Sequence, residues 1–104
     1  MKEKITVMVK EPEEVAQVKE IDNTLDQLHK IVGGYIEVTG FTDNILIICD
    51  EEGKMKWLRP NFQLRNDTIV GTVIFVGNGE DGEFKSLTIG QIEKIKTRWM
   101  EVNK

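Results

Sequence analysis

The sequence predicts an α+β domain, in which a mainly antiparallel sheet of about five to six strands carries a C-terminal helix on one face. Short apolar runs bounded by turn residues recur along most of the chain, as in antiparallel strands. The last segment instead repeats its apolar residues at helical spacing, and a short helix ends at a Gly-Gly pair. With 104 residues and 39% hydrophobic content, we expect residues 1–104 to form one small domain with a core that needs no disulfide or metal.

The Gly-Gly pair marks a reversal from helix to strand. Apolar residues at three- and four-residue spacing predict a helix over Leu25–Val32, and Asp22-Asn23-Thr24 supplies suitable N-cap side chains. A strand over Tyr35–Phe41 follows. Because a helix must stop and reverse here, we expect positive φ at Gly33 or Gly34. The short helix is expected to cover an end of the sheet.

The N-terminal part predicts a half-buried strand over Ile5–Val9, because its apolar residues alternate with other side chains. The next run fits two structures. Val15, Val18 and Ile21 suit a short helix, whereas the alternation from Ala16 to Ile21 suits an extended segment, which we favour.

The middle of the chain predicts further strands. Ile45–Cys49 is continuously apolar, as in a central strand covered on both faces. Asp50–Gly53 is interpreted as a tight hairpin turn into a strand over Lys54–Leu58 with its lysines outward. Arg59–Asp67 is then the longest irregular connection. Thr68–Val76 follows as one buried strand, with a bulge or close approach at Gly71.

The C-terminal part predicts a flexible turn at Gly77–Gly82 and a final helix capped by Ser86 or Thr88. The residues expected on one apolar face of that helix are Ile89, Ile92, Ile95, Trp99 and Val102.

Composition excludes several classes of function. The net charge of −4 and the lack of a basic patch argue against direct nucleic-acid binding. No signal-peptide region or membrane span is visible, and the single cysteine, Cys49, fits a reducing compartment. We therefore expect a cytoplasmic protein without membrane contact.

No catalytic, metal or cofactor site is predicted. Gly77-x-Gly79-x-x-Gly82 matches a dinucleotide fingerprint, but its acidic residues would repel phosphate and no helix opens directly after it. His29 is the only histidine, and we expect it to face solvent or pack partly on its helix. Cys49 is expected to be a small core residue. Glu37 and Glu51 do not by themselves indicate acid–base catalysis, because the sequence does not place the two carboxylates near each other.

One cluster combines the aromatic and arginine residues that are enriched at binding hot spots. Its members are the possible partner- or ligand-binding residues Tyr35, Trp57, Arg59, Asn61 and Arg65. We expect this patch to favour an anionic ligand or an acidic partner face. The alternative is that Trp57 packs under the last helix and the arginines form surface ion pairs.

The run Leu28-x-x-Ile31-Val32-Gly33-Gly34-Tyr35-Ile36-Glu37 resembles the hallmark of a known family, domain of unknown function 3846. Those small proteins occur in phages and mobile elements of Gram-positive bacteria. The resemblance covers most of the chain from Val7 to Leu87 and includes Glu51-Glu52-Gly53-Lys54, Pro60-Asn61 and Ile69–Val73. Asp50 stands where the family pattern has Asn, and Trp57 and Phe62 are individual to this chain.

The resemblance implies a mobile-element accessory protein and supplies no catalytic residues. The leading hypothesis is a non-enzymatic binding module that acts on a host protein or a small ligand. One alternative is an accessory subunit that forms a homo-oligomer. The other is a small hydrolase or transferase, but the sequence shows no nucleophile motif, metal-ligand set or acid–base pair that would support it.

Overall fold

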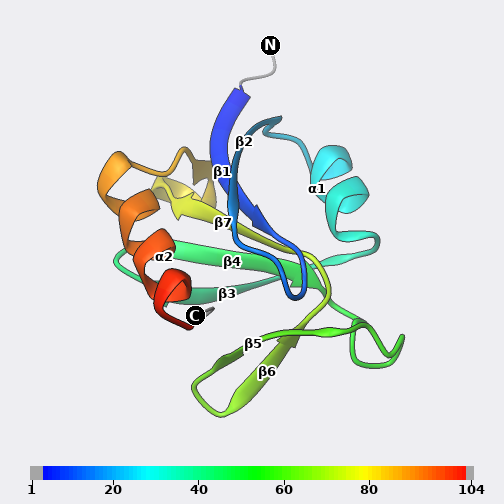
Figure 1. The fold of residues 1–104 in the computed structure, drawn as a ribbon. Helices are drawn as coiled ribbons and strands as arrows, with labels where there is room; N and C mark the ends of the chain where they lie inside the picture. Colours follow the sequence, from blue (N-terminus) through cyan, green and yellow to red (C-terminus); the bar gives the residue numbers. More distant parts are fainter. Residues whose placement is uncertain (1–3, 103–104) are drawn as a thin grey trace.

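Within the described part of the chain, which is residues 4–102 for the backbone and 4–98 for side chains, the computed structural model shows a six-stranded antiparallel sheet, a separate hairpin and two helices (Figure 1). The elements are β1 Lys4–Lys10, β2 Gln17–Asp22, α1 Leu25–Val32, β3 Ile36–Thr42, β4 Ile45–Asp50, β5 Pro60–Leu64, β6 Asp67–Val70, β7 Val73–Asn78, the short 3₁₀ helix η1 Glu80–Gly82, β8 Phe84–Lys85 and α2 Ile89–Val102. The sheet order is β2-β1-β7-β4-β3, and β8 pairs with the end of β7. The predicted α+β fold is confirmed.

The two faces of the sheet are covered by different elements. On one face, Leu64 and Ile69 of the β5–β6 hairpin and Ile95 of α2 pack around Phe75. On the other face, Leu28 and Val32 of α1 pack on residues of β1, β4 and β7. The short helix therefore packs on the second face of the sheet.

The helix-to-strand reversal follows the predicted local chemistry. The Thr24 hydroxyl accepts the Gln27 backbone N–H at 3.2 Å, which caps the first turn of α1. Gly33 has φ 87°, and its N–H donates to the His29 carbonyl at 2.8 Å. The prediction of positive φ at this pair is confirmed at Gly33. The extended segment favoured over Ala16–Ile21 is also confirmed, as β2.

The final helix begins with reciprocal capping. The Thr88 hydroxyl accepts the Gln91 backbone N–H, while the Gln91 side chain accepts the Thr88 N–H. Ile95 is fully buried, but Ile89 is 82% exposed, so the apolar face begins one turn later than predicted. The side chains of Trp99 and Val102 lie outside the described residues.

The predicted hairpin at Asp50–Gly53 and the predicted strand over Lys54–Leu58 are wrong. Residues 51–57 form consecutive tight turns, which we call the Trp57 turn. The Gly53 N–H donates to the Asp50 carbonyl and the Leu58 N–H to the Gly53 carbonyl, so local bonds replace a strand ladder. Lys54 forms an ion pair with Asp67, and Lys56 forms one with Asp50, whereas the predicted strand had both lysines pointing outward.

The interpretation of Arg59–Asp67 as an irregular connection is also wrong, because its centre is the strand β5. This strand pairs with β6 through a tight turn in which Arg65 has φ 54°. A bulge between Pro60 and Phe62 accommodates the proline, which cannot donate to a ladder.

The single strand predicted over Thr68–Val76 is divided in two. Gly71, at φ 76°, separates β6 of the hairpin from β7 of the main sheet. The positive φ favours glycine, and a Cβ at this position would lie 2.7 Å from Leu58 Cδ1, so that side chain would have to move. The predicted close approach at Gly71 is present, and the chain turns there from the hairpin into the main sheet.

Candidate functional site

The five residues predicted as a binding patch fall into two groups. Arg59, Asn61 and Arg65 are engaged in hydrogen bonds or ion pairs within the chain. Tyr35 and Trp57 instead hold their rings in solvent, with exposed fractions of 66% and 91%. The alternative in which Trp57 packs under the last helix is therefore wrong. A contact between any of the five residues and a partner stays a prediction.

Asn61 joins three segments. Its amide nitrogen donates to the carbonyls of Lys10 at 2.8 Å and Gly71 at 2.7 Å, and its oxygen accepts from the Lys10 ammonium at 2.7 Å. Lys10 is only 3% exposed. Burial lowers the pKa of Lys10, partly offset by the charge of Glu14. The Asn61 oxygen therefore stabilises a buried ammonium group.

The two arginines are held in different ways. The Arg59 guanidinium pairs with the Glu13 carboxylate at 2.6 Å, and both side chains are well exposed. The Arg65 guanidinium donates to the carbonyls of Gly40 at 3.4 Å and Phe41 at 3.0 Å, at the end of β3. Their charge is thus directed to partners inside the molecule, which weakens the case for an anionic ligand.

The Trp57 turn carries apolar side chains into solvent. Trp57 adopts φ 59°, which is uncommon for a residue with a bulky side chain. Met55 in the same turn is 79% exposed. The Glu51 N–H donates to the Tyr35 carbonyl at 2.8 Å, so the segment that carries Tyr35 lies beside this turn. We call these side chains, Tyr35, Met55 and Trp57, the apolar surface.

An ion pair between the buried Asp50 and the partly exposed Lys56 fixes the Trp57 turn on the sheet. The Asp50 side chain is 2% exposed and accepts from the Lys56 ammonium at 2.7 Å and from the Glu52 N–H at 2.8 Å. Burial alone would raise the pKa of Asp50, but these hydrogen bonds and the lysine charge outweigh it and lower the pKa. The hydrogen bond to Asp50 in turn raises the pKa of Lys56. Lys56 also reaches the Gly33 carbonyl at 3.4 Å.

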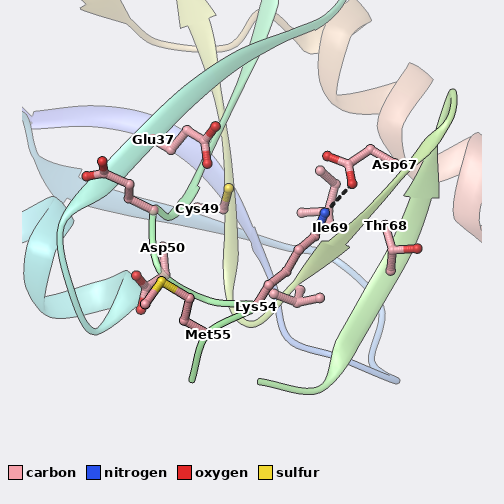
Figure 2. Close-up of a pocket in the computed structure, with 10 residues that line it drawn as sticks. Glu37, Cys49, Asp50, Lys54, Met55, Asp67, Thr68 and Ile69 are labelled. Carbon is pink, nitrogen blue, oxygen red and sulfur yellow. Dashed lines mark hydrogen bonds and ion pairs between the residues drawn. The ribbon is translucent and has the colours of Figure 1, made fainter. Parts of the chain in front are cut away.

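A groove separates the sheet from the β5–β6 hairpin, as Figure 2 shows. Two adjoining hollows of about 170 and 290 Å³ share Glu37, Cys49, Asp67 and Ile69 in their walls. Lys54 extends from the Trp57 turn across the groove and forms an ion pair with Asp67 (Figure 2). Its hydrogen bond lowers the pKa of Asp67. Among the described residues, the Glu37 carboxylate has no ion-pair or hydrogen-bond partner.

Cys49 and His29 behave as the sequence predicts. The Cys49 thiol is buried at the floor of the groove, and burial, followed by the charges of Glu37 and Asp50, raises its pKa to about 11. His29 is partly buried and makes an edge-on contact with the Tyr35 ring, with ring centres 5.6 Å apart. Among the described residues, no three His, Cys, Asp or Glu side chains gather as metal ligands would.

The sequence alone did not reveal Met55 or Glu37 as surface-forming residues, because both depend on how the Trp57 turn and the hairpin fold. One signal was available for the buried pair. Asp50 follows a fully apolar strand and Lys56 follows six residues later, so a turn between them could bring the charges together.

These features define a small α+β domain with one antiparallel sheet and a grooved, partly acidic surface beside an exposed tryptophan. The chain belongs to the family described as domain of unknown function (DUF3846), whose model matches residues 5–100. No curated protein and no solved structure matches the chain. Across the described residues, neither helix has the length and apolar character needed to cross a membrane.

Proposed function

We propose that this protein is a non-enzymatic binding protein and that its partner is another protein that docks on the apolar surface. The observation that supports this is the exposure of Trp57, Met55 and Tyr35 on two adjoining segments. Aromatic side chains on a surface are the residues that contribute most to protein–protein binding. The Trp57 N–H donates to the Lys54 carbonyl at 3.1 Å, so the backbone that carries the indole is already ordered and costs less to immobilise on binding.

A protein partner fits this surface better than a small ligand does. Drug-sized ligands occupy concave sites of about 300–1,000 Å³. The two hollows of the groove are smaller, at about 170 and 290 Å³. Two hollows of about 390 and 610 Å³ elsewhere on the molecule fall within that range, but neither includes a residue of the apolar surface in its walls. The apolar surface itself projects from a turn. Catalysis by Cys49 is disfavoured, because a thiol with a pKa of about 11 is protonated at neutral pH and no histidine lines the groove.

The biological setting belongs to the same proposal. The resemblance to proteins of phages and mobile elements supports an accessory role in the cytoplasm of a bacterial host, with a host protein as the partner. An oligomeric accessory subunit is the competing reading, and the molecular mass in solution distinguishes a homo-oligomer from a monomer that awaits a partner.

Affinity capture from host lysate, with mass spectrometry of proteins and small molecules, tests the proposed function. We expect Trp57→Ser to weaken capture of one recurring protein by about 2 kcal/mol while the melting temperature stays near that of the parent. Ile89→Ser is the matched control, because Ile89 is an equally exposed apolar residue on α2. Equal losses in both variants, or a partner that binds Trp57→Ser as well as the parent, would contradict the proposal.

A further inference from the structure

The outer edge of β3 carries unpaired backbone groups. The Glu51 N–H bonds to the Tyr35 carbonyl, and the register continues as Glu37 opposite Cys49 and Thr39 opposite Ile47. In an antiparallel pair, alternate residues bond inward and the others face outward. The N–H and C=O groups of Ile36, Val38 and Gly40 therefore face away from β4, and no other strand in the described chain pairs with them.

Arg65 limits this edge at one end. Its guanidinium occupies the carbonyls of Gly40 and Phe41, where a bulge also interrupts the strand. The accessible stretch is thus centred on Val38, whose side chain is 42% exposed. It begins directly after Tyr35, so it is continuous with the apolar surface. Its length suits a segment of about five residues.

One side chain of this edge, Glu37, is acidic on the face that borders the groove. Glu37 and Thr39 line the hollow there together with Asp67 and Arg65 of the hairpin, and the Arg65 guanidinium is bonded to the carbonyls of Gly40 and Phe41. The Asp67 charge is paired with Lys54, whereas the Glu37 carboxylate forms no ion pair with any described residue. A strand added to β3 would place the residues opposite Glu37 and Thr39 in this acidic hollow.

We propose that the edge of β3 binds an extended basic segment of a partner protein as an additional antiparallel strand. This inference rests on the proposed binding function and specifies the chemistry of the partner. Backbone hydrogen bonds to Ile36 and Val38 provide the pairing. A lysine or arginine opposite Glu37 enters the groove, and an apolar residue opposite Val38 covers that exposed side chain.

A second copy of this chain fits the edge less well. Self-pairing centred on Val38 would place Glu37 of the other copy opposite Thr39 and so add a carboxylate to the groove. Of the described cations that line the groove, Lys54 is already paired with Asp67, and Arg65 is bonded to the Gly40 and Phe41 carbonyls. The opposite edge of the main sheet, β2, carries exposed Lys19 and Glu20 on its two faces, and an edge lysine disfavours strand addition. Charge therefore favours β3 as the edge and a basic segment as its occupant.

The probe is a fluorescein-labelled, capped peptide of sequence Gly-Thr-Lys-Val-Lys-Thr-Gly, whose central valine is designed to lie opposite Val38. Binding is measured by fluorescence anisotropy at low and at moderate salt. Two control peptides isolate the two contributions. One has glutamate in place of both lysines, and the other has an N-methylated central valine that cannot donate a hydrogen bond to β3. We expect both to bind at least about tenfold more weakly than the probe.

Matched protein variants locate the site. Val38→Pro removes an outward N–H and no ladder bond, so it should keep the melting temperature and weaken binding at least about tenfold. Val18→Pro is the control on the opposite edge. The Thr6 N–H donates to the Ser86 hydroxyl and the Thr6 carbonyl accepts the Leu87 N–H, so Thr6 bonds on the side of β1 away from β2. Met8, two residues further on, also bonds away from β2. Val18 lies opposite Met8, so the Val18 N–H faces outward from the sheet. Glu37→Lys should reverse the preference toward the glutamate peptide, whereas Glu20→Lys, with the same change in net charge, should not.

The proposal is overturned if the parent does not bind the lysine peptide at millimolar concentration, or if Val18→Pro and Val38→Pro behave alike. It is also overturned if light scattering shows a dimer that Val38→Pro dissociates, because the occupant is then a second copy. Loss of host-protein capture in Trp57→Ser with no binding of the peptide would support the proposed function and reject this inference alone.

Discussion

The amide of Asn61 holds the end of β1, the Gly71 corner and the hairpin together through three hydrogen bonds. Asn61→Ala would leave two carbonyls and the buried Lys10 ammonium without these partners. We therefore expect a loss of about 3 kcal/mol in the free energy of unfolding, measured by urea denaturation. Asn61→Asp retains an acceptor for Lys10 and should lose less. An unchanged denaturation midpoint in the alanine variant would show that the Lys10 ammonium finds another partner.

At the scale of elements, the two glycines after α1 are required for different reasons. Gly33 needs its left-handed conformation, at φ 87°. Gly34 needs space, because a Cβ there would lie 2.7 Å from Lys56 Nζ and 2.9 Å from Asp50 Oδ2. The helix end and the Trp57 turn are thereby packed against each other through the Asp50–Lys56 pair.

Alanine substitutions separate the two requirements. We expect Gly33→Ala to lose about 1 kcal/mol of stability because of backbone strain alone. Gly34→Ala should lose more, because the buried Asp50 carboxylate has little room to move. Gly40→Ala is the control, since a Cβ at Gly40 meets no atom within 4 Å. Thermal melts of the three variants decide the order, and a Gly34→Ala melt equal to that of Gly40→Ala would refute the packing argument.

For the whole molecule, the Asp50–Lys56 pair couples stability to pH. The pKa of Asp50 in the folded state lies below its ordinary value of 3.8, so the unfolded state binds more protons between the two values. The stabilisation is complete above about pH 5 and is lost as the pH falls through the folded pKa. Lys56 has the opposite dependence, because its raised pKa makes its contribution decline only in strong alkali.

Melting temperatures from pH 3 to pH 7 measure this dependence. We expect Asp50→Asn to be less stable than the parent at neutral pH and to lose less stability in acid, so the two curves converge as the pH falls. Asp26→Asn is the control, because the Asp26 side chain is 81% exposed in its helical ion pair with Lys30. Parallel curves for the parent and Asp50→Asn would show that Asp50 is not the group responsible.

Sequence periodicity was sufficient for the elements whose structure is local. The α1 helix has the predicted bounds, since its cap residues and apolar spacing lie within the same twelve residues. Periodicity was insufficient between residues 50 and 72. There, Lys54 and Lys56 alternate with apolar residues as in a strand, but they lie in a turn and form ion pairs with Asp67 and Asp50. The apolar run that follows is divided between the hairpin and the main sheet. Trp57 and Tyr35 were named as possible binding residues, but the sequence left open whether Trp57 packs under the last helix. The groove depends on how the hairpin folds and could not be predicted.

The position of β7 has a consequence for how the chain folds during synthesis. β1–β2 and β3–β4 are hairpins of neighbouring segments and can form from local contacts as they emerge. β7 pairs with both β1 and β4 and joins the two hairpins into one sheet. Until residue 78 has left the ribosome, the facing edges of β1 and β4 have no partner, and the nascent chain holds two half-sheets. β7, the central strand in the order β2-β1-β7-β4-β3, is therefore the last of these five strands to be synthesised.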